Sequence, residues 1–301
     1  MRWLSYGAVL VVCLWGVGAG AKTAFAAEMV VTNRQGVTLA VAQDDTEPAL
    51  VLTLPNRPGI AIRVLFPEHV TVNRRGANDV ERLYLYRPGK AGVRPQWRVA
   101  GSTLTYESDL KQDVHLLARA TLEDDGILFH YELKNRSQVD YETVNSITDP
   151  RMLASLHDER LERTYVHYKD GFALLGAETP ERLTMPLVQW FPVRYLASYT
   201  WPVPAQRVEK RGDDITYYNT SRAVDEPLIA TVSTDRRWVV ASFTKNTGNV
   251  WSNPELTCQH VDPSKPLPAG GEAVIEVKVL IFQGTLDQAL EKERAQRQAL
   301  Q

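Results

Sequence analysis

Short segments in which apolar and polar residues alternate dominate this sequence, and they constrain its fold more than any other feature. Such alternation is typical of β-strands that bury one face of a sheet. We predict strands at residues 59–66, 81–87, 102–108, 113–123, 126–135, 214–220, 227–233, 237–244 and 272–284. Turn residues, such as those at 124–126 and 211–213, separate these segments. Because no helical pattern lies between the strands, we predict an all-β chain, a large antiparallel β-sandwich.

The C-terminus departs from this pattern. Thr285, followed three residues later by Gln288, resembles a capping box, and Leu286, Ala289 and Leu290 then fall on one side of a helix. We predict a C-terminal α-helix over 285–301 that packs across a sheet edge or extends into solvent. Residues 28–284 then form a single β domain.

The N-terminus has the pattern of a secretory signal peptide. Arg2 precedes an apolar run at 8–19, and Ala24-Phe25-Ala26 has the small-x-small form of a cleavage site. The apolar run is shorter than the roughly 20 residues that a bilayer-spanning helix needs. We therefore predict cleavage after residue 27, a periplasmic or extracellular location, and no membrane span in the mature protein. A retained N-terminal anchor is the alternative.

Composition limits the partners and the means of stabilisation. Removing residues 1–27 takes away Arg2, Lys22 and Cys13, so the formal net charge changes from −2 to −4 and Cys258 is the remaining cysteine. One cysteine forms no internal disulfide, so a large core must stabilise the exported chain. Without a long basic block, nucleic acid is not an expected partner.

The predicted hairpin at 113–135 divides into two faces. Small and apolar residues alternate along both strands, whereas His115, Arg119, His130 and Glu132 share the opposite face. That face is either a solvated surface with an Arg119–Glu132 pair or a concave surface that grips a hydroxyl-rich ligand. In the second interpretation His130 binds substrate.

Two motifs carry a resemblance to a known fold family. The hairpin "DDGILFHYELKNRS" ends in Lys134-Asn135-Arg136-Ser137, and "PLPAGGEAVIEV" precedes the last strand. With the aromatic stretch between them, these motifs resemble the galactose-mutarotase-like supersandwich of aldose epimerases and of β domains in glycoside hydrolases and polysaccharide lyases. The sequence is also similar to a group of uncharacterised secreted bacterial proteins that carry "GNVWSNP…C.H.DP".

The resemblance implies carbohydrate binding on a concave sheet lined by polar and aromatic side chains. Aldose epimerases use a histidine acid and a glutamate base, with the histidine in a His-Pro-Tyr-Phe-Asn-like segment. The nearest position here holds "VNSITDPRM" at 144–152. The resemblance therefore implies a fold and a ligand class, and it transfers no mechanism.

Polar residues crowd the stretch from 149 to 170. His157, Tyr165 and His167 are candidate proton-transfer groups, and Arg151 and Arg163 are candidates for holding a sugar carboxylate. A charged connecting loop with ordinary ion pairs is the alternative.

Aromatic residues interrupted by prolines fill the stretch 187–207. Trp190 and Trp201 are candidates for stacking against a pyranose ring. Their rings would otherwise plug the end of the sandwich as part of the core. We expect an ordered excursion that is too broken for a regular strand.

The stretch "GNVWSNPELTCQHVDP" (248–263) contains Trp251, another substrate-binding candidate. If 256–262 is extended, Cys258, His260 and Asp262 share one face. They could then ligate zinc, with His157 or His167 completing or replacing a ligand. Alternatively, His260 belongs to a catalytic site without metal, or the stretch is a structural corner. No cofactor is firmly implied, although the residues are compatible with a divalent metal.

Three functions are consistent with the sequence. The first is an exported carbohydrate-active enzyme of the lyase, glycosidase or epimerase type, which acts on a poly- or oligosaccharide or a modified sugar. The second is a non-catalytic carbohydrate-binding protein. The third is a structural envelope protein.

Overall fold

We describe the protein from a computed structural model. The described residues are 29–301 except 43–46, 55, 78–79, 90–91, 176–194, 201–206, 211–215, 220–223, 247–248 and 253–255. The predicted signal peptide, Trp190 and Trp201 lie outside these residues. Within them, helices lack the length and apolar character needed to cross a membrane.

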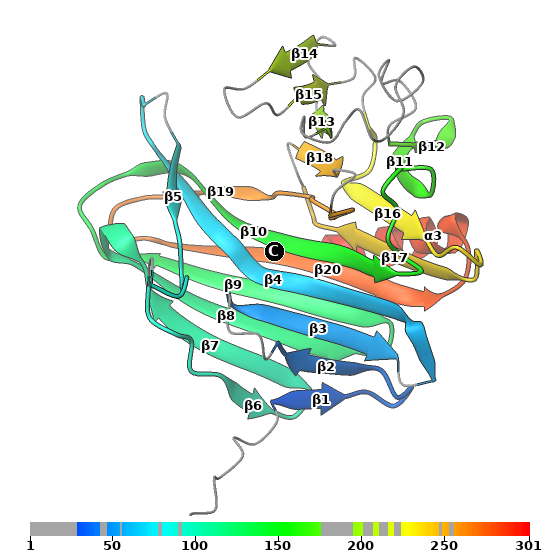
Figure 1. Cartoon of the computed structure of the whole chain (residues 1–301). Helices are drawn as coiled ribbons and strands as arrows, with labels where there is room; N and C mark the ends of the chain where they lie inside the picture. The colour runs from blue at the N-terminus through cyan, green and yellow to red at the C-terminus, as the bar shows by residue number, and fades with distance from the viewer. Residues whose placement is uncertain are drawn as a thin grey trace, which may run out of the picture.

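Two large sheets pack face to face (Figure 1). The first has the strand order β1–β2–β3–β4–β10–β19, and β5 pairs with a further part of the long strand β4. Its strands are β1 (Val30–Thr32), β2 (Thr38–Val41), β3 (Ala49–Leu54), β4 (Arg57–Arg74), β5 (Val80–Leu83), β10 (Tyr141–Ala154) and β19 (Ser264–Leu267). All its pairs are antiparallel.

The second sheet is also antiparallel and has the order β12–β11–β16–β17–β20–β9–β8–β7–β6. Its strands are β6 (Arg98–Ala100), β7 (Thr103–Asp109), β8 (Val114–Glu123), β9 (Gly126–Asn135), β11 (Thr164–Tyr168), β12 (Gly171–Leu174), β16 (Leu228–Val232), β17 (Trp238–Phe243) and β20 (Glu272–Gln283). A 3₁₀ turn at Lys111–Asp113 leads into β8.

A third, small sheet has the order β14–β15–β13–β18. It consists of β13 (Tyr195–Thr200), β14 (Arg207–Lys210), β15 (Thr216–Asn219) and β18 (Asn249–Ser252), and β13 and β15 run parallel. Figure 1 shows it beyond β10, on the same side as β16. The presence of β13 corrects our expectation that the aromatic stretch 187–207 is too broken for a strand.

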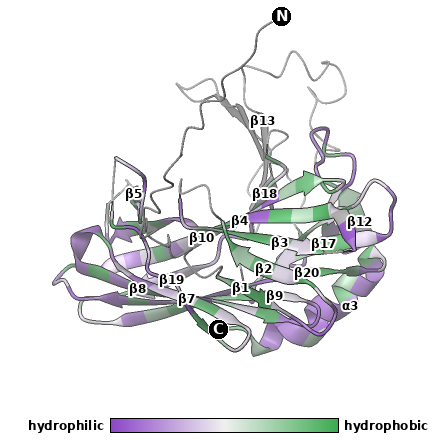
Figure 2. Ribbon diagram, turned by 60° about the horizontal axis from the view of Figure 1, so that its bottom comes forward, coloured by the Kyte–Doolittle hydropathy of each residue, from purple (hydrophilic) through white to green (hydrophobic). Residues whose placement is uncertain are grey.

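The main core lies between the inner faces of the two large sheets. Alternating residues of β4 enter it, including Ile62, Val64 and Phe66, and they meet residues of β9 such as Phe129 and Tyr131. Figure 2 shows hydrophobic and hydrophilic residues alternating along the strands, as burial of one face requires. The predicted apolar face of the hairpin 113–135 is thus confirmed as core.

The motif at 134–137 has a structural role. Asn135 is fully buried, and its side-chain amide donates to the carbonyls of Val139 and Pro268 at 2.7 and 3.0 Å. Its Oδ1 accepts hydrogen bonds from the amide and hydroxyl of Ser137. The motif therefore ties the end of β9 to the turn before β20.

The C-terminal helix is confirmed, as α3 (Leu286–Gln296) followed by a 3₁₀ turn at Arg297–Ala299. Thr285 and Gln288 form the predicted capping box. Ala289, Leu286 and Leu290 pack against the outer faces of β16 and β17, which covers a second, smaller apolar cluster. The helix therefore covers the face of the sheet and not its edge.

Candidate functional site

The stretch 257–265 runs beside β10 as a neighbouring extended segment. Arg151 bridges to Cys258, and Asn145 pairs with Ser264 farther along. The two pairs have the same register, which sets His260 opposite Asp149. Because side chains alternate between faces, Cys258 and His260 share the outer face with Asp149 and Arg151.

The intervening residues point the opposite way. Gln259 lies between the sheets, where its amide nitrogen donates to the hydroxyl of Thr231 at 3.0 Å and to the carbonyl of Val240 at 3.1 Å. Val261 belongs to the core. This alternation agrees with the one-face geometry that the sequence predicts for Cys258, His260 and Asp262.

The strand on the other side of this segment is β18. Trp251 and His260 exchange two backbone hydrogen bonds, at 3.1 and 3.0 Å, and their rings stack with centroids 3.9 Å apart. The indole Nε1–H of Trp251 donates to Oδ2 of Asp262 at 2.7 Å. We call Asp149, Arg151, Trp251, Cys258, His260 and Asp262 the outer-face cluster.

Asp149 is the central anion of the outer-face cluster and is only 1% exposed. Its Oδ2 accepts from Nε of Arg151 at 2.7 Å, and its Oδ1 lies 3.3 Å from Nε2 of His260. Burial opposes ionisation of Asp149, but the charges of His260 and Arg151 outweigh it, so the pKa of this carboxyl lies below its usual value.

His260 has a carboxylate at each ring nitrogen, because Nδ1 lies 3.1 Å from Oδ1 of Asp262. Burial favours the neutral ring, but Cys258 and the two carboxylates outweigh it and raise the pKa of His260 well above its usual value. The two aspartates therefore favour the protonated form of His260.

Two residues of β4 face the same charges. Burial, followed by the charge of Asp149, raises the pKa of Glu68. Burial and the charge of Arg82 lower the pKa of His69 to about 4, so its ring is neutral near pH 7. A carboxyl with a raised pKa thus lies beside a neutral imidazole, with 3.5 Å between Glu68 Oε2 and His69 Nδ1.

The sequence placed Asp149 in the polar stretch 149–170 without indicating a role for it, and it did not mark Glu68 or His69 as site residues. The register between β4 and β10 shifts between Ile147 and Asp149, and residues 66–68 of β4 form the extra length of this bulge. A bulge re-aims side chains, which pattern alone does not reveal. Reading 141–154 as one extended strand would have put Asp149 and Arg151 on one face, but it would not have shown that His260 lies opposite Asp149.

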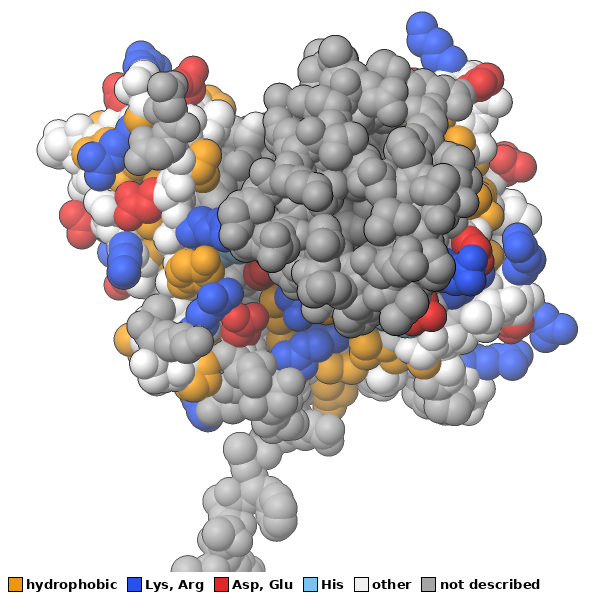
Figure 3. Space-filling model, turned by 45° about the horizontal axis from the view of Figure 1, so that its top comes forward, with side chains coloured by type: hydrophobic (Ala, Val, Ile, Leu, Met, Phe, Trp, Pro, Cys, Tyr) orange, Lys and Arg blue, Asp and Glu red, His pale blue; other side chains and the backbone are white. Residues whose placement is uncertain are grey.

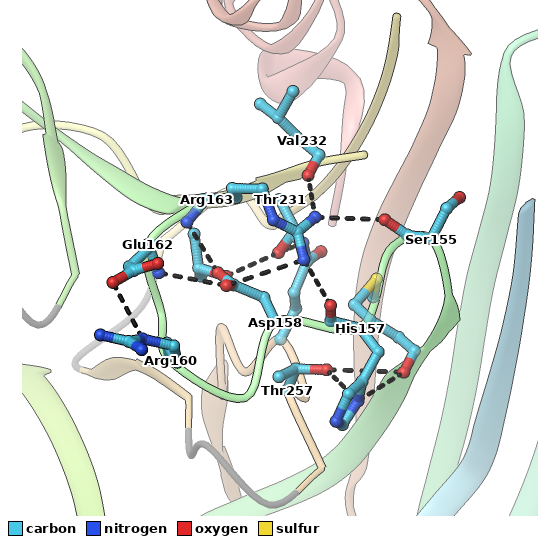
Figure 4. Close-up of polar contacts among 12 residues, drawn as sticks. Ser155, His157, Asp158, Arg160, Glu162, Arg163, Thr231, Val232 and Thr257 are labelled. Carbon is cyan, nitrogen blue, oxygen red and sulfur yellow. Dashed lines mark hydrogen bonds and ion pairs between the residues drawn. The ribbon is translucent and has the colours of Figure 1, made fainter. Parts of the chain in front are cut away.

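The predicted residues His157 and Arg163 lie in a different polar cluster (Figure 4). Arg163 donates through Nη1 to the carbonyls of Ser155 and Val232 at 3.1 and 2.7 Å, and through Nη2 to the carbonyl of His157. Nδ1 of His157 lies 3.2 Å from the Thr257 hydroxyl and 3.3 Å from the Met152 carbonyl. Apart from the Thr257 hydroxyl, these partners are backbone carbonyls, so the contacts hold a loop in place.

Tyr165 and His167 lie on β11 in the second sheet. Tyr165 lines an open groove of about 360 Å³ with Phe172, Arg236 and Leu286. Nδ1 of His167 lies 2.6 Å from Oδ1 of Asp225. Neither residue joins the outer-face cluster.

His130 lies on the exposed face of the second sheet. Its Nδ1 is 2.7 Å from Glu276, and its Nε2 is 3.1 Å from Glu132, which also pairs with Arg119. The predicted Arg119–Glu132 pair is therefore present. Of the predicted substrate-binding residues, the structure brings Arg151 and Trp251 together and places Arg163 and His130 elsewhere.

The ligand-type side chains form a set that differs from the predicted one. Asp149, Cys258 and His260 are all buried, and their ligand atoms lie within 4.8 Å of one another. Asp149 takes the place that we gave to Asp262, which instead contacts the far nitrogen of His260. His157 and His167 are engaged by other groups.

No protein-family model and no curated protein matches this sequence. Solved structures do match. A "putative aldose 1-epimerase" from Escherichia coli shares 8% identity and a TM-score of 0.50, over 85% of this chain and 99% of that chain. The chain has the β-sandwich fold of that structure.

Two further neighbours are more distant by TM-score. A galactose mutarotase-like protein from Lactobacillus casei has 12% identity and a TM-score of 0.48, covering 85% of this chain and 100% of that chain. An α-N-acetylgalactosaminidase from Bifidobacterium bifidum has 10% identity and a TM-score of 0.48, covering 89% of this chain and 38% of that chain.

Proposed function

We propose that this protein is exported and acts on or binds a sugar, an oligosaccharide or a modified sugar, at the outer-face cluster. One observation carries the proposal. A single face of three neighbouring chain segments gathers an indole, an arginine and a histidine flanked by two carboxylates. The similarity to the Escherichia coli structure supports the fold, and we infer the carbohydrate ligand class from that fold.

The cluster offers the contacts that a sugar needs. Carboxylates accept hydrogen bonds from hydroxyl groups, and the guanidinium of Arg151 is a bidentate donor suited to a sugar carboxylate. The Trp251 indole supplies an apolar surface for a pyranose ring. In Figure 3, side chains of both charges and hydrophobic side chains are interspersed on the face toward the third sheet. This mixture suits a ligand with both hydroxyl and apolar faces.

Proton transfer is the chemistry that the neighbouring residues support. Opening a sugar ring or eliminating across a uronic acid requires one group that gives a proton and another that takes one. Glu68 and His69 are a carboxyl and an imidazole on β4 that face the cluster, with 3.5 Å between Glu68 Oε2 and His69 Nδ1, and both group types can transfer protons. We assign proton transfer to these two residues and ligand binding to Arg151 and Trp251.

Export rests on the N-terminal sequence. Expression of the full chain in a bacterium should yield a periplasmic or secreted product whose mass corresponds to a start near Ala27 or Glu28. A cytoplasmic product that retains Met1 or Arg2 would contradict this part of the proposal.

Binding is tested by a thermal-shift and glycan-array screen of neutral and acidic oligosaccharides. We expect saturable binding that Trp251→Ala and Arg151→Gln each weaken at least tenfold. Trp238→Phe, a change at a partly buried tryptophan of the second sheet, is the matched control and should bind normally. If the wild-type protein responds to no carbohydrate, the proposal is wrong.

Turnover separates an enzyme from a binding protein. Each ligand found in the screen is incubated with wild type, Glu68→Gln and His69→Gln, and products and anomeric exchange are followed by NMR. Loss of turnover with retained binding in both variants supports the assigned roles. Binding without any wild-type turnover supports the second candidate, a non-catalytic carbohydrate-binding protein, which the occupation of both His260 nitrogens favours.

A further inference from the structure

Three buried side chains of the outer-face cluster have the chemistry of metal ligands. A carboxylate oxygen of Asp149, the sulfur of Cys258 and a ring nitrogen of His260 all lie within 4.8 Å of one another. Each of the three residues is at most 2% exposed. Oxygen, sulfur and nitrogen donors in one set are typical of zinc sites.

The backbone explains why these groups converge. Cys258 and His260 are two residues apart on an extended segment, so they share a face, and Asp149 lies opposite His260 on β10. The geometry therefore depends on the register of this extended segment, which isolated bridges hold against β10 on one side and β18 on the other.

Surrounding groups orient His260. Nδ1 of His260 lies 3.1 Å from Oδ1 of Asp262, whose other oxygen accepts from the Trp251 indole at 2.7 Å. This leaves Nε2 of His260 directed at Asp149. A carboxylate behind a histidine is the usual support of a histidine that binds metal.

Asp149 has one oxygen directed into this space. Its Oδ2 is held by Arg151 at 2.7 Å. Its Oδ1 is buried and has no well-directed hydrogen bond among the described residues, although Nε2 of His260 is 3.3 Å away. A buried carboxylate oxygen in this condition calls for an explanation, and a bound cation provides one.

We propose that Asp149, Cys258 and His260 are the protein ligands of a divalent-metal site, with zinc as the best-fitting ion and Asp262 as the residue that orients His260. Bonds of about 2.0–2.3 Å place tetrahedral ligand atoms about 3.3–3.8 Å apart. The His260–Asp149 separation of 3.3 Å already meets this spacing, and the 4.8 Å limit of the set requires shifts of about 1 Å. Three protein ligands leave the fourth position open for a water or another ligand.

This inference does not depend on the proposed function, because it concerns metal binding alone. The competing arrangement is an ion-paired network in which a protonated His260 takes the place of the metal. The two arrangements differ in whether Nε2 of His260 and the Cys258 sulfur bind an ion.

The purified protein is stripped with a chelator, titrated with Zn²⁺ or Co²⁺, dialysed and assayed by elemental analysis. We expect one equivalent of metal, and a thiolate-to-cobalt charge-transfer absorption in the Co²⁺ form. Cys258→Ser should abolish this absorption, and His260→Gln should weaken binding at least tenfold. Asp262→Asn should weaken it by about 10–100-fold, as loss of an orienting carboxylate does.

His167→Gln is the matched control, because His167 also lies beside an aspartate, at 2.6 Å, but belongs to a different sheet. It should retain one equivalent of metal and the cobalt absorption. Circular dichroism of each variant shows whether it is folded.

A metal content near zero in the wild type, or a bound Co²⁺ without thiolate absorption, would overturn the inference without reliance on any variant. Carbohydrate binding is measured on chelated and metal-loaded protein in parallel. Loss of carbohydrate binding alone then counts against the proposed function, and loss of metal binding alone counts against the metal site.

Discussion

Two polar clusters contact the C-terminal part of β10 and its neighbouring segment, and both combine an arginine, an aspartate and a histidine. In the first, which we call the Arg163 cluster, the arginine donates to three backbone carbonyls. Asp158 accepts from the amides of Glu162 and Arg163 at 3.1 and 2.8 Å. Asp158 also accepts from the Thr164 hydroxyl at 2.8 Å and lies 3.8 Å from the Arg163 guanidinium. Most partners of the two charged groups are nevertheless backbone groups, and the cluster stabilises the loop that leads into β11.

The outer-face cluster is built from side chains that contact one another. Asp149 is held by Arg151, His260 lies between Asp149 and Asp262, and the Trp251 ring covers His260. A side chain can release a neighbouring side chain and bind a ligand without any movement of the main chain. A backbone carbonyl can be released from its partner only if a chain segment moves. Similar residue types thus serve stability in one cluster and suit ligand binding in the other.

The largest expected effect lies in the Arg163 cluster. Arg163→Ala leaves three carbonyls and the nearly buried Asp158 without the guanidinium, so the free energy of unfolding should fall by about 3–5 kcal/mol. Denaturant unfolding measures this loss. At a temperature where the variant is folded, its metal content should equal that of wild type. A loss of unfolding free energy below about 1 kcal/mol would contradict the stabilising role that distinguishes the Arg163 cluster from the outer-face cluster.

His260→Gln should reduce the free energy of unfolding less than Arg163→Ala does, and it should weaken ligand binding more. Asp149 keeps Arg151 and Asp262 keeps the Trp251 indole, so we expect a loss of about 2 kcal/mol in chelated protein. Both carbohydrate and metal binding should weaken. A stability loss equal to that of Arg163→Ala, with ligand binding intact, would give both clusters the same structural role.

Trp251→Phe isolates one hydrogen bond of the outer-face cluster. Phenylalanine keeps an aromatic ring over His260 but removes the donor to Asp262, so unfolding should become about 1 kcal/mol easier. Differential scanning calorimetry provides the measurement, with Trp238→Phe as the control. Unchanged stability together with unchanged binding would show that the indole nitrogen has no part in orienting Asp262.

The smallest expected effect is a pH-dependent change in stability at His130, which lies outside both clusters. The hydrogen bond to Glu276 raises the pKa of His130, so the pair stabilises the fold below about pH 6.5. This contribution is lost as the pH rises through the raised pKa. His130→Gln should therefore cost up to about 1 kcal/mol at pH 5.5 and less at pH 9. Denaturant unfolding at both pH values checks this, and a larger cost at pH 9 would reverse the sign.

Much of the fold follows from local pattern. The predicted strands at 113–123 and 126–135 match β8 and β9 closely, because one face is apolar and the other polar in strict alternation. Strand β10 escaped prediction. Its sequence "YETVNSITDPRMLA" is rich in polar residues and contains Pro150, since one face packs on the core while the other carries the outer-face cluster. A strand that bears a site does not show the alternation of a solvated strand.

The candidate site was predictable only in part. His260, Cys258, Arg151 and Trp251 are conspicuous as residue types, and alternation along 256–262 correctly puts Cys258 and His260 on one face. Alternation does not say which strand lies beside them. His157 and Arg163 were equally conspicuous in the sequence, yet their partners are backbone carbonyls and a threonine.

By itself, the sequence determined the all-β class, the faces of the central hairpin and the capped C-terminal helix, because these depend on residues close together in the chain. Only the tertiary structure decided that Asp149 meets His260, which is 111 positions later in the chain. It also decided that Glu68 and His69 face them across a bulge. The physical reason is that such contacts depend on strand register and sheet order, which the packing of the whole core sets.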